Sequence, residues 1–179
     1  DWNGTETFTY KANDGTVDSN TSTITVTVTA VNDVPVASAV SASTNEDTAK
    51  TITLSATDVE GSSLTYSIVG NPSNGSLGSV SGTSVTYTPT ANWNGTDTFT
   101  YKANDGTVDS NTATVTVTVA AVNDVPVAAA VSASTNEDTA KTITLSATDV
   151  EGSSLTYSIV SNPSNGSLGS VSGANVTYT

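Results

Sequence analysis

The chain has 179 residues, of which 17 are acidic and 4 are basic, and its formal net charge is −13. It contains no Cys, His or Met, which excludes disulfides, thiolate or imidazole metal ligands, and the Ser-His-Asp and Cys-His catalytic arrangements. Four lysines are too few to neutralise the phosphates of a nucleic acid, and no apolar run is long enough to span a membrane.

Internal repetition organises the sequence. The stretch AVNDVPVA at residues 30–37 returns unchanged at residues 121–128, and an offset of 91 residues aligns residues 1–88 with residues 92–179. A repeat of this length corresponds to a whole small domain and not to a solenoid unit. We therefore expect three segments in chain order: the C-terminal part of a repeat at 1–31, a complete repeat at 32–122, and the N-terminal part of a repeat at 123–179.

Residues 1–31 are expected to hold only the last two strands of a repeat. Alternation places Phe8 and Tyr10 on one face, together with Ile24, Val26 and Val28, and a lone two-stranded hairpin is marginal in water. Two situations fit: a window from a longer continuous array, which we favour, or separate copies that complete one another head to tail by strand donation. Both predict that neighbouring copies of the repeat are the partners and cover the apolar faces of 1–31 and 124–179.

The complete repeat predicts an all-β fold, with tandem seven-stranded antiparallel Greek-key sandwiches. Val and Thr fit a pleated surface, while the turns DVEG, NPSNG, NWNG and NDG bound stretches of period-2 alternation. Alternation directs Phe99 and Tyr101 into the core, and Trp93 is expected to cap the open end of the sandwich and not to form a sugar-binding platform. The predicted strands are 35–43, 50–57, 64–69, 76–81, 84–88, 97–103 and 112–120.

Three stretches carry a resemblance to a known family: ATDVEGSSLTYSI, FTYKANDGTVDSNTATVTVTV and AVNDVP. Together they resemble the cadherin-like repeats of large bacterial surface adhesins, and the likeness covers the whole chain. The resemblance implies immunoglobulin-like sandwiches in an extended rod, calcium at the junctions between domains, and an extracellular or cell-surface location. Cadherin repeats commonly carry an acidic motif before the sixth strand, where this chain has ANWNG, so the resemblance implies fewer or weaker ions per junction.

The acidic residues gather at the ends of the predicted strands. Because antiparallel strands alternate in direction, these ends collect at two poles, and in a tandem array the poles meet at the junctions. Calcium (Ca²⁺) takes six to eight oxygen ligands from carboxylates, Asn side chains and carbonyl groups. The same residues also suit turns, where Asp and Asn satisfy nearby backbone groups, so both readings stay open. The candidate ligands are Asn32, Asp33, Asp58, Glu60 and Asp105 at the first junction, Glu46, Asn123, Asp124, Asp149 and Glu151 at the second, and Glu137.

These features indicate a non-enzymatic function: a calcium-stiffened extension or fibre segment of an extracellular adhesin. The alternative is a glycan- or protein-binding adhesion module of the same surface protein, although near-identical repeats usually serve length. Asp58 and Glu60 would allow acid–base chemistry, but they lie on predicted turns with no recognisable cleft, so we do not expect an enzyme.

Overall fold

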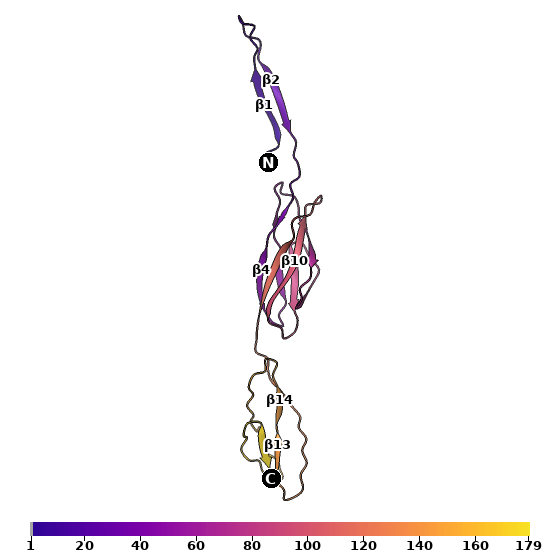
Figure 1. Cartoon of the computed structure of the whole chain (residues 1–179), viewed down its shortest axis with the longest axis vertical. Coiled ribbons are helices and arrows are strands. Elements are labelled where there is room, and N and C mark those ends of the chain that lie inside the picture. Colours follow the sequence, from indigo (N-terminus) through magenta and orange to yellow (C-terminus); the bar gives the residue numbers. More distant parts are fainter. Residues whose placement is uncertain (1) are drawn as a thin grey trace. The chain divides into compact units, whose positions relative to one another are not determined.

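The structure, a computed structural model, describes residues 2–179, and every regular element in that range is a β-strand (Figure 1). The chain divides into two compact units, which meet in sequence between Ala120 and Ala121. Among the described residues there is no helix of the length and apolarity that crossing a membrane requires.

A β-hairpin opens the chain. Its strands β1 (Gly4–Tyr10) and β2 (Ser22–Val28) pair antiparallel, with Gly4 opposite Val28 and Tyr10 opposite Ser22. The apolar face predicted from alternation forms, but it stays open to solvent: Phe8 is 55% exposed and Val26 is 43% exposed.

Residues 32–120 form the complete sandwich, and the all-β fold predicted from the sequence is confirmed (Figure 1). One sheet has the strand order β4-β11-β10-β7, another has the order β5-β9-β8, and β3 and β6 form a short separate pair. The strands are β3 (Val36–Ala37), β4 (Val40–Asn45), β5 (Lys50–Thr53), β6 (Ala56–Thr57), β7 (Thr65–Gly70), β8 (Gly75–Leu77), β9 (Ser84–Pro89), β10 (Gly95–Asn104) and β11 (Ala113–Ala120).

The pairing is not antiparallel throughout, which corrects the sequence prediction. Strand β4 runs parallel to β11, from Val40 opposite Val115 to Asn45 opposite Ala120. Six reversals of direction separate the first strand of the repeat from the seventh, so these two strands point the same way and can pair only in parallel.

Two predicted strands are each divided in the structure. The stretch 35–43 becomes β3 and β4 because the chain crosses from one sheet to the other, and 50–57 becomes β5 and β6. The break coincides with the Tyr101 hydroxyl, which accepts a hydrogen bond from the Ser55 amide at 3.1 Å and lies 2.6 Å from the Ser38 carbonyl oxygen. The Tyr101 side chain, which comes from β10, therefore interrupts the regular backbone pairing at this point.

The core of the sandwich depends heavily on its last two strands. Eleven buried apolar residues form one cluster, and six of them come from β10 and β11. Trp93 packs against this cluster as the predicted cap. The six residues are Phe99, Tyr101, Ala113, Val115, Val117 and Val119.

Asp97 is also part of this interior. It is only 3% exposed, and its carboxylate accepts hydrogen bonds from the amides of Ser73 and Asn74 and from the Tyr87 hydroxyl. Asp97 alternates with Phe99 along β10, and this alternation points its side chain inward. The pattern that located the core could therefore have located this carboxylate.

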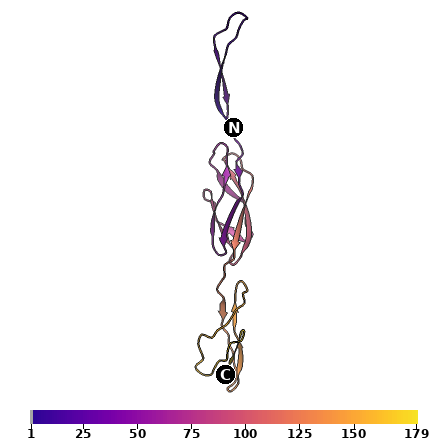
Figure 2. The ribbon, with the colours of Figure 1, turned by 90° about the vertical axis from the view of Figure 1, so that its left-hand side faces the viewer.

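The second unit repeats only part of the sandwich. Its strands pair as β12 with β14 and as β13 with β15, and Lys141 lies opposite Tyr178 as Lys50 lies opposite Tyr87. Much of the unit is irregular chain (Figure 2). The strands are β12 (Val127–Ala129), β13 (Lys141–Thr144), β14 (Ser146–Thr148) and β15 (Asn175–Tyr178).

Candidate metal site at one end of the sandwich

Three segments meet at the end of the sandwich where the first strand begins: the linker before β3, the turn after β6 and the loop between β10 and β11. The Asn32 side-chain amide donates a hydrogen bond to Asp105 Oδ2 at 2.7 Å. The Asp33 backbone amide donates to Glu60 Oε2 at 3.1 Å. Residues separated by 73 and 27 positions in sequence are thus brought together, as strand direction predicted.

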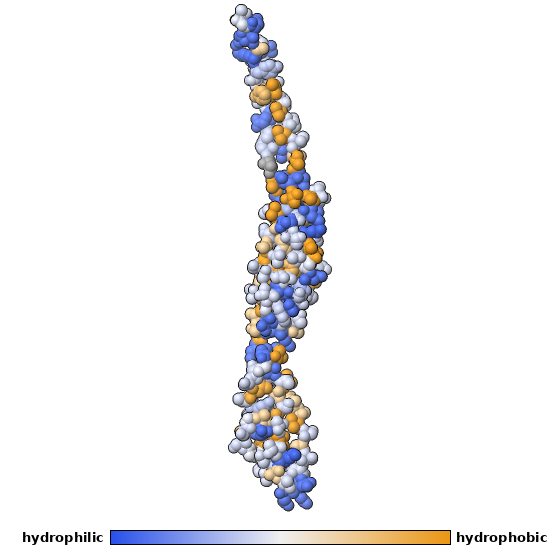
Figure 3. All heavy atoms as spheres, viewed as in Figure 1, coloured by the Kyte–Doolittle hydropathy of each residue, from blue (hydrophilic) through white to orange (hydrophobic). Residues whose placement is uncertain are grey.

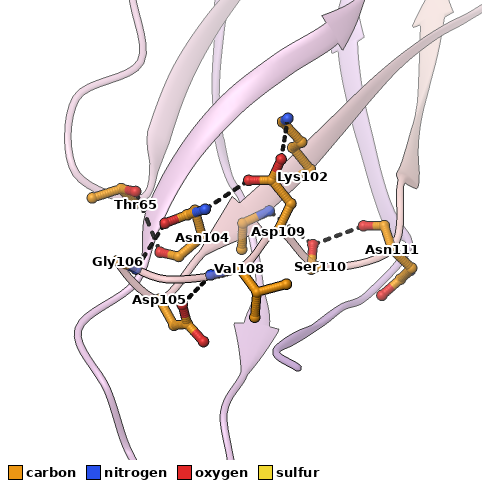
Figure 4. Close-up of polar contacts among 10 residues, drawn as sticks. Thr65, Lys102, Asn104, Asp105, Gly106, Val108, Asp109, Ser110 and Asn111 are labelled. Carbon is orange, nitrogen blue, oxygen red and sulfur yellow. Dashed lines mark hydrogen bonds and ion pairs between the residues drawn. The ribbon is translucent and has the colours of Figure 1, made fainter. Parts of the chain in front are cut away.

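The loop between β10 and β11 orients Asp105 (Figure 4). Asp105 Oδ1 accepts hydrogen bonds from the Val108 amide and from both the amide and the hydroxyl of Thr107. The hydrogen bond from Asn32, followed by those from this loop, holds the pKa of Asp105 well below its usual range. Asp105 is therefore a turn former whose other oxygen faces the linker, so the two readings of the sequence are compatible at this residue.

Asp109 has a different role. It lies opposite Asn104 across the same loop. It forms an ion pair with Lys102 and accepts a hydrogen bond from the Asn104 side chain at 2.7 Å (Figure 4). The hydrogen bond from Lys102, followed by that from Asn104, lowers the pKa of Asp109. This acid closes the hairpin loop through its contacts with Lys102 and Asn104.

Asp58 has the chemistry expected of a cation ligand. Its Oδ1 accepts a hydrogen bond from the Ser62 amide at 2.8 Å, whereas its Oδ2 is buried without a hydrogen-bond partner. The pairing of Val36 with Thr57 places Asp58 directly after the strand that lies beside the start of β3. A buried carboxylate oxygen without a partner is costly, and a bound cation would satisfy it.

The other candidate ligands contact one another in pairs and do not surround a common point. Within residues 2–179, no group of three or more carboxylates is arranged to hold a metal ion. Asp33 and Glu60 do line one recess, and the other residues that line it are Trp2, Asn3, Thr29, Ala30 and Val31.

The second unit carries the same arrangement at its own start. The Asp124 amide donates to Glu151 Oε2 at 3.3 Å, Asp149 Oδ1 accepts from the Ser153 amide at 2.8 Å, and the Asn123 side chain donates to the Asp124 carbonyl oxygen. These contacts match those of Asp33 with Glu60 and of Asp58 with Ser62.

The two remaining candidates lie at the other end of their repeats. Glu46 is buried, and its amide donates to the Ala120 carbonyl oxygen at 2.9 Å. Its counterpart Glu137 is exposed, in a turn where its carbonyl oxygen accepts a hydrogen bond from the Thr139 hydroxyl. Neither residue is in the group formed by Asn32, Asp33 and their partners.

Comparison with known proteins identifies the domain type. A search of curated proteins finds no match. Among solved structures, the chain is similar to an endo-fucoidan hydrolase from glycoside hydrolase family 107, MfFcnA4, with 18% identity, a TM-score of 0.40, and coverage of 99% of this chain and 29% of the hydrolase. It is also similar to domains 1–6 of the surface layer protein SbsC, with 22% identity, a TM-score of 0.39, and coverage of 99% of this chain and 25% of that structure.

The family model described as bacterial Ig domain matches residues 32–118 and again residues 123–179. This result confirms the immunoglobulin-like part of the resemblance, while the cadherin-like adhesin repeat stays a prediction. The chain belongs to the bacterial Ig domain family.

Proposed function

We propose that the chain is a structural segment of an extracellular or cell-surface bacterial protein, in which tandem Ig domains supply length. Two observations support this proposal: the family match over two successive segments and the near-identity of the repeats. Near-identical domains suit a spacer because each domain presents the same surface to the next one. On this proposal the chain has no catalytic role.

The finer part of the proposal is that calcium binds where the linker enters a domain and stiffens that connection. The observation that carries it is the buried Asp58 Oδ2 without a hydrogen-bond partner. In the first domain, Asn32, Asp33, Asp58, Glu60 and Asp105 would hold the ion. In the second, Asn123, Asp124, Asp149 and Glu151 would do so.

Charge gives this proposal its physical basis. Asp105 is ionised, since its pKa is well below its usual range, and a divalent cation would offset the repulsion between it and the neighbouring acids. The Asn32 amide group now donates to Asp105 Oδ2, and a half-turn of that amide would present an oxygen to a cation instead. Binding would tie the linker to two loops of the domain, which restricts bending at the linker.

Calorimetric titration with calcium chloride tests this part directly. We expect a dissociation constant on the order of 10⁻⁴ to 10⁻³ M, as for extracellular calcium modules. At about tenfold excess of calcium over that constant, the sandwich gains about 1.4 kcal/mol, which a chelator removes. Asp58→Asn should weaken binding by about tenfold or more, because affinity follows ligand charge.

Asp18→Asn is the matched control, since it removes the same charge from an exposed ion pair with Lys11 on the first hairpin. Exposed ion pairs contribute little, so this variant should bind calcium as the unmodified chain does. Absence of binding heat together with chelator-independent melting would refute the calcium proposal, as would equal losses in the two variants. The structural role would then stand without the ion.

A further inference from the structure

Two asparagines of the complete sandwich are each followed by a glycine, in the pairs Asn74–Gly75 and Asn94–Gly95. Hydrophilic and near-neutral residues make up most of the surface seen in Figure 3, so an exposed asparagine by itself is not unusual. A following glycine is different, because a residue without a Cβ leaves its backbone nitrogen open to the asparagine side chain. Attack of that nitrogen on the side-chain amide converts asparagine into aspartate without an enzyme.

This conversion, deamidation, needs no co-reactant except water. The glycine nitrogen forms a bond to Cγ of the asparagine, the bond from Cγ to Nδ2 breaks, and ammonia leaves with the proton of the glycine amide. Water then opens the resulting cyclic succinimide at either of its carbonyl groups. One route gives aspartate, and the other gives isoaspartate, whose backbone is longer by a methylene group. The first step requires that the side chain and the following peptide group rotate toward one another.

Hydrogen bonds immobilise the peptide group between Asn74 and Gly75. The Asn74 carbonyl oxygen, which shares that peptide group with the Gly75 nitrogen, accepts from the Thr90 amide at 2.9 Å and from the Tyr87 hydroxyl at 3.3 Å. The Asn74 amide donates to Asp97 Oδ2 at 2.9 Å. The Tyr87 ring also packs against Gly75, where a Cβ would lie 2.6 Å from a ring carbon. Rotation at this pair therefore requires the turn to open.

The Asn94–Gly95 pair has no such restraint on its asparagine. The Asn94 side chain is exposed and makes no hydrogen bond to any residue within 2–179. Over the same described range, the Asn94 carbonyl oxygen accepts no hydrogen bond from a turn or from a side chain. The contacts that hold Asn74 thus have no counterpart at Asn94.

We propose that Asn94 is a site of spontaneous deamidation, whereas the fold protects Asn74 although it has the same following residue. The Asn94–Gly95 pair reacts in the folded domain, and the Asn74–Gly75 pair reacts only in molecules in which the turn has opened locally. This inference goes beyond the proposed structural role, and it does not rest on calcium.

Conversion changes the end of the sandwich from which the chain continues toward residue 121. Gly95 lies opposite Val119, next to the last residue of β11, so a carboxylate at position 94 adds negative charge there. The Trp93 ring lies against Gly95, 3.0 Å from the position that a Cβ would take, and packs on the core. The extra methylene group of isoaspartate separates Gly95 from that ring and should loosen the cap, whereas aspartate keeps the backbone unchanged.

Peptide mapping of the 179-residue chain by mass spectrometry, after incubation in a mildly alkaline buffer, tests the proposal. The differences Asp1/Asn92, Glu6/Asp97 and Gly70/Ser161 distinguish the peptides of the complete repeat by mass. We expect Asn94 to convert at least about tenfold faster than Asn74, because Asn74 reacts only in the open fraction of molecules. In denaturant, where nothing holds either pair, the two asparagines should convert at similar rates.

Asn94→Gln is the matched variant, because glutamine would have to close a larger ring and position 94 is exposed. It should abolish conversion at this position and leave the melting of residues 32–120 unchanged. Asn94 that stays intact in the folded chain, or that converts no faster than Asn74, would overturn the proposal.

Asn94→Asp separates the effect of the charge from that of the longer backbone. This variant should melt as the unmodified chain does, whereas the isoaspartate form isolated from incubated chain should melt at a lower temperature. Equal melting of the isoaspartate form and the unmodified chain would refute the effect on the Trp93 cap.

Discussion

At the residue scale, the Asp97 side chain is buried and yet has a lowered pKa. Burial alone raises its pKa, but hydrogen bonds from the amides of Asn74, Ser73 and Thr98 and from Tyr87 outweigh that effect and lower it. The same contact acts on Tyr87: burial and the hydrogen bond to Asp97 raise the pKa of the Tyr87 hydroxyl to about 12. One carboxylate thus joins the turn at residues 73–74 to the core.

Removing this carboxylate should destabilise the complete sandwich. Asp97→Ala leaves the amides of Ser73 and Asn74 and the Tyr87 hydroxyl without their partner, which costs on the order of 3 kcal/mol. Chemical denaturation of the 179-residue chain, following the transition of residues 32–120, measures this loss. A change below about 0.5 kcal/mol, the size of an ordinary surface substitution, would contradict the assignment.

The lowered pKa also predicts a dependence on pH. Asp97 contributes its full stabilisation above its ordinary pKa of 3.8 and loses it as the pH falls through the lower value of the folded state. The melting temperature of Asp97→Asn should therefore fall less than that of the unmodified chain between about pH 5 and about pH 3. Parallel curves for the two proteins would show that the charge of Asp97 has no part in stability.

At the scale of elements, the hairpins β1–β2 and β10–β11 have near-identical sequences in opposite environments. Val117 is 0% exposed, whereas the equivalent Val26 is 43% exposed. The difference arises because β10–β11 lies on a complementary sheet and β1–β2 does not. The two hairpins have the same register because their sequences are nearly identical. The neighbouring strands decide whether the apolar face of each hairpin is buried.

This pair of hairpins offers a matched comparison. Val117→Ala should destabilise residues 32–120 by about 2 kcal/mol, because it opens a space in a packed core. Val26→Ala makes the same chemical change on an exposed face, so in dilute monomer it should leave the melting of that sandwich within about 0.5 kcal/mol of the unmodified value. Equal effects of the two substitutions would contradict the placement of β1–β2 outside the complete sandwich.

The sequence predicted these elements well where a local signal exists. Alternation located Phe99, Tyr101 and Val117 in the core, and strand direction brought Asn32 to Asp105. It did not predict that 35–43 divides between two sheets, because that crossing depends on the Tyr101 hydroxyl, contributed by a distant strand. For the same reason the buried oxygen of Asp58 could not be foreseen, since turn formers and ligands look alike in sequence.

At the scale of the whole molecule, the acidic composition governs the long-range forces between domains and between copies. A net charge of −13 opposes the association of copies through long-range repulsion, which salt screens over about 8 to 10 Å at physiological ionic strength. On the proposed function, a calcium ion bound where the linker enters each domain would offset part of that charge.

Hydrogen exchange measured by mass spectrometry, with calcium and with a chelator, tests the central claim most directly. The differences Ser38/Ala129 and Gly70/Ser161 distinguish peptides of the two repeats by mass. If calcium ties the linker to the loops of the domain, the backbone amides of residues 32–34 and 58–62 should exchange more slowly with calcium than with the chelator, while those of β10 and β11 should not change. Equal exchange of residues 32–34 and 58–62 under the two conditions would contradict the proposal.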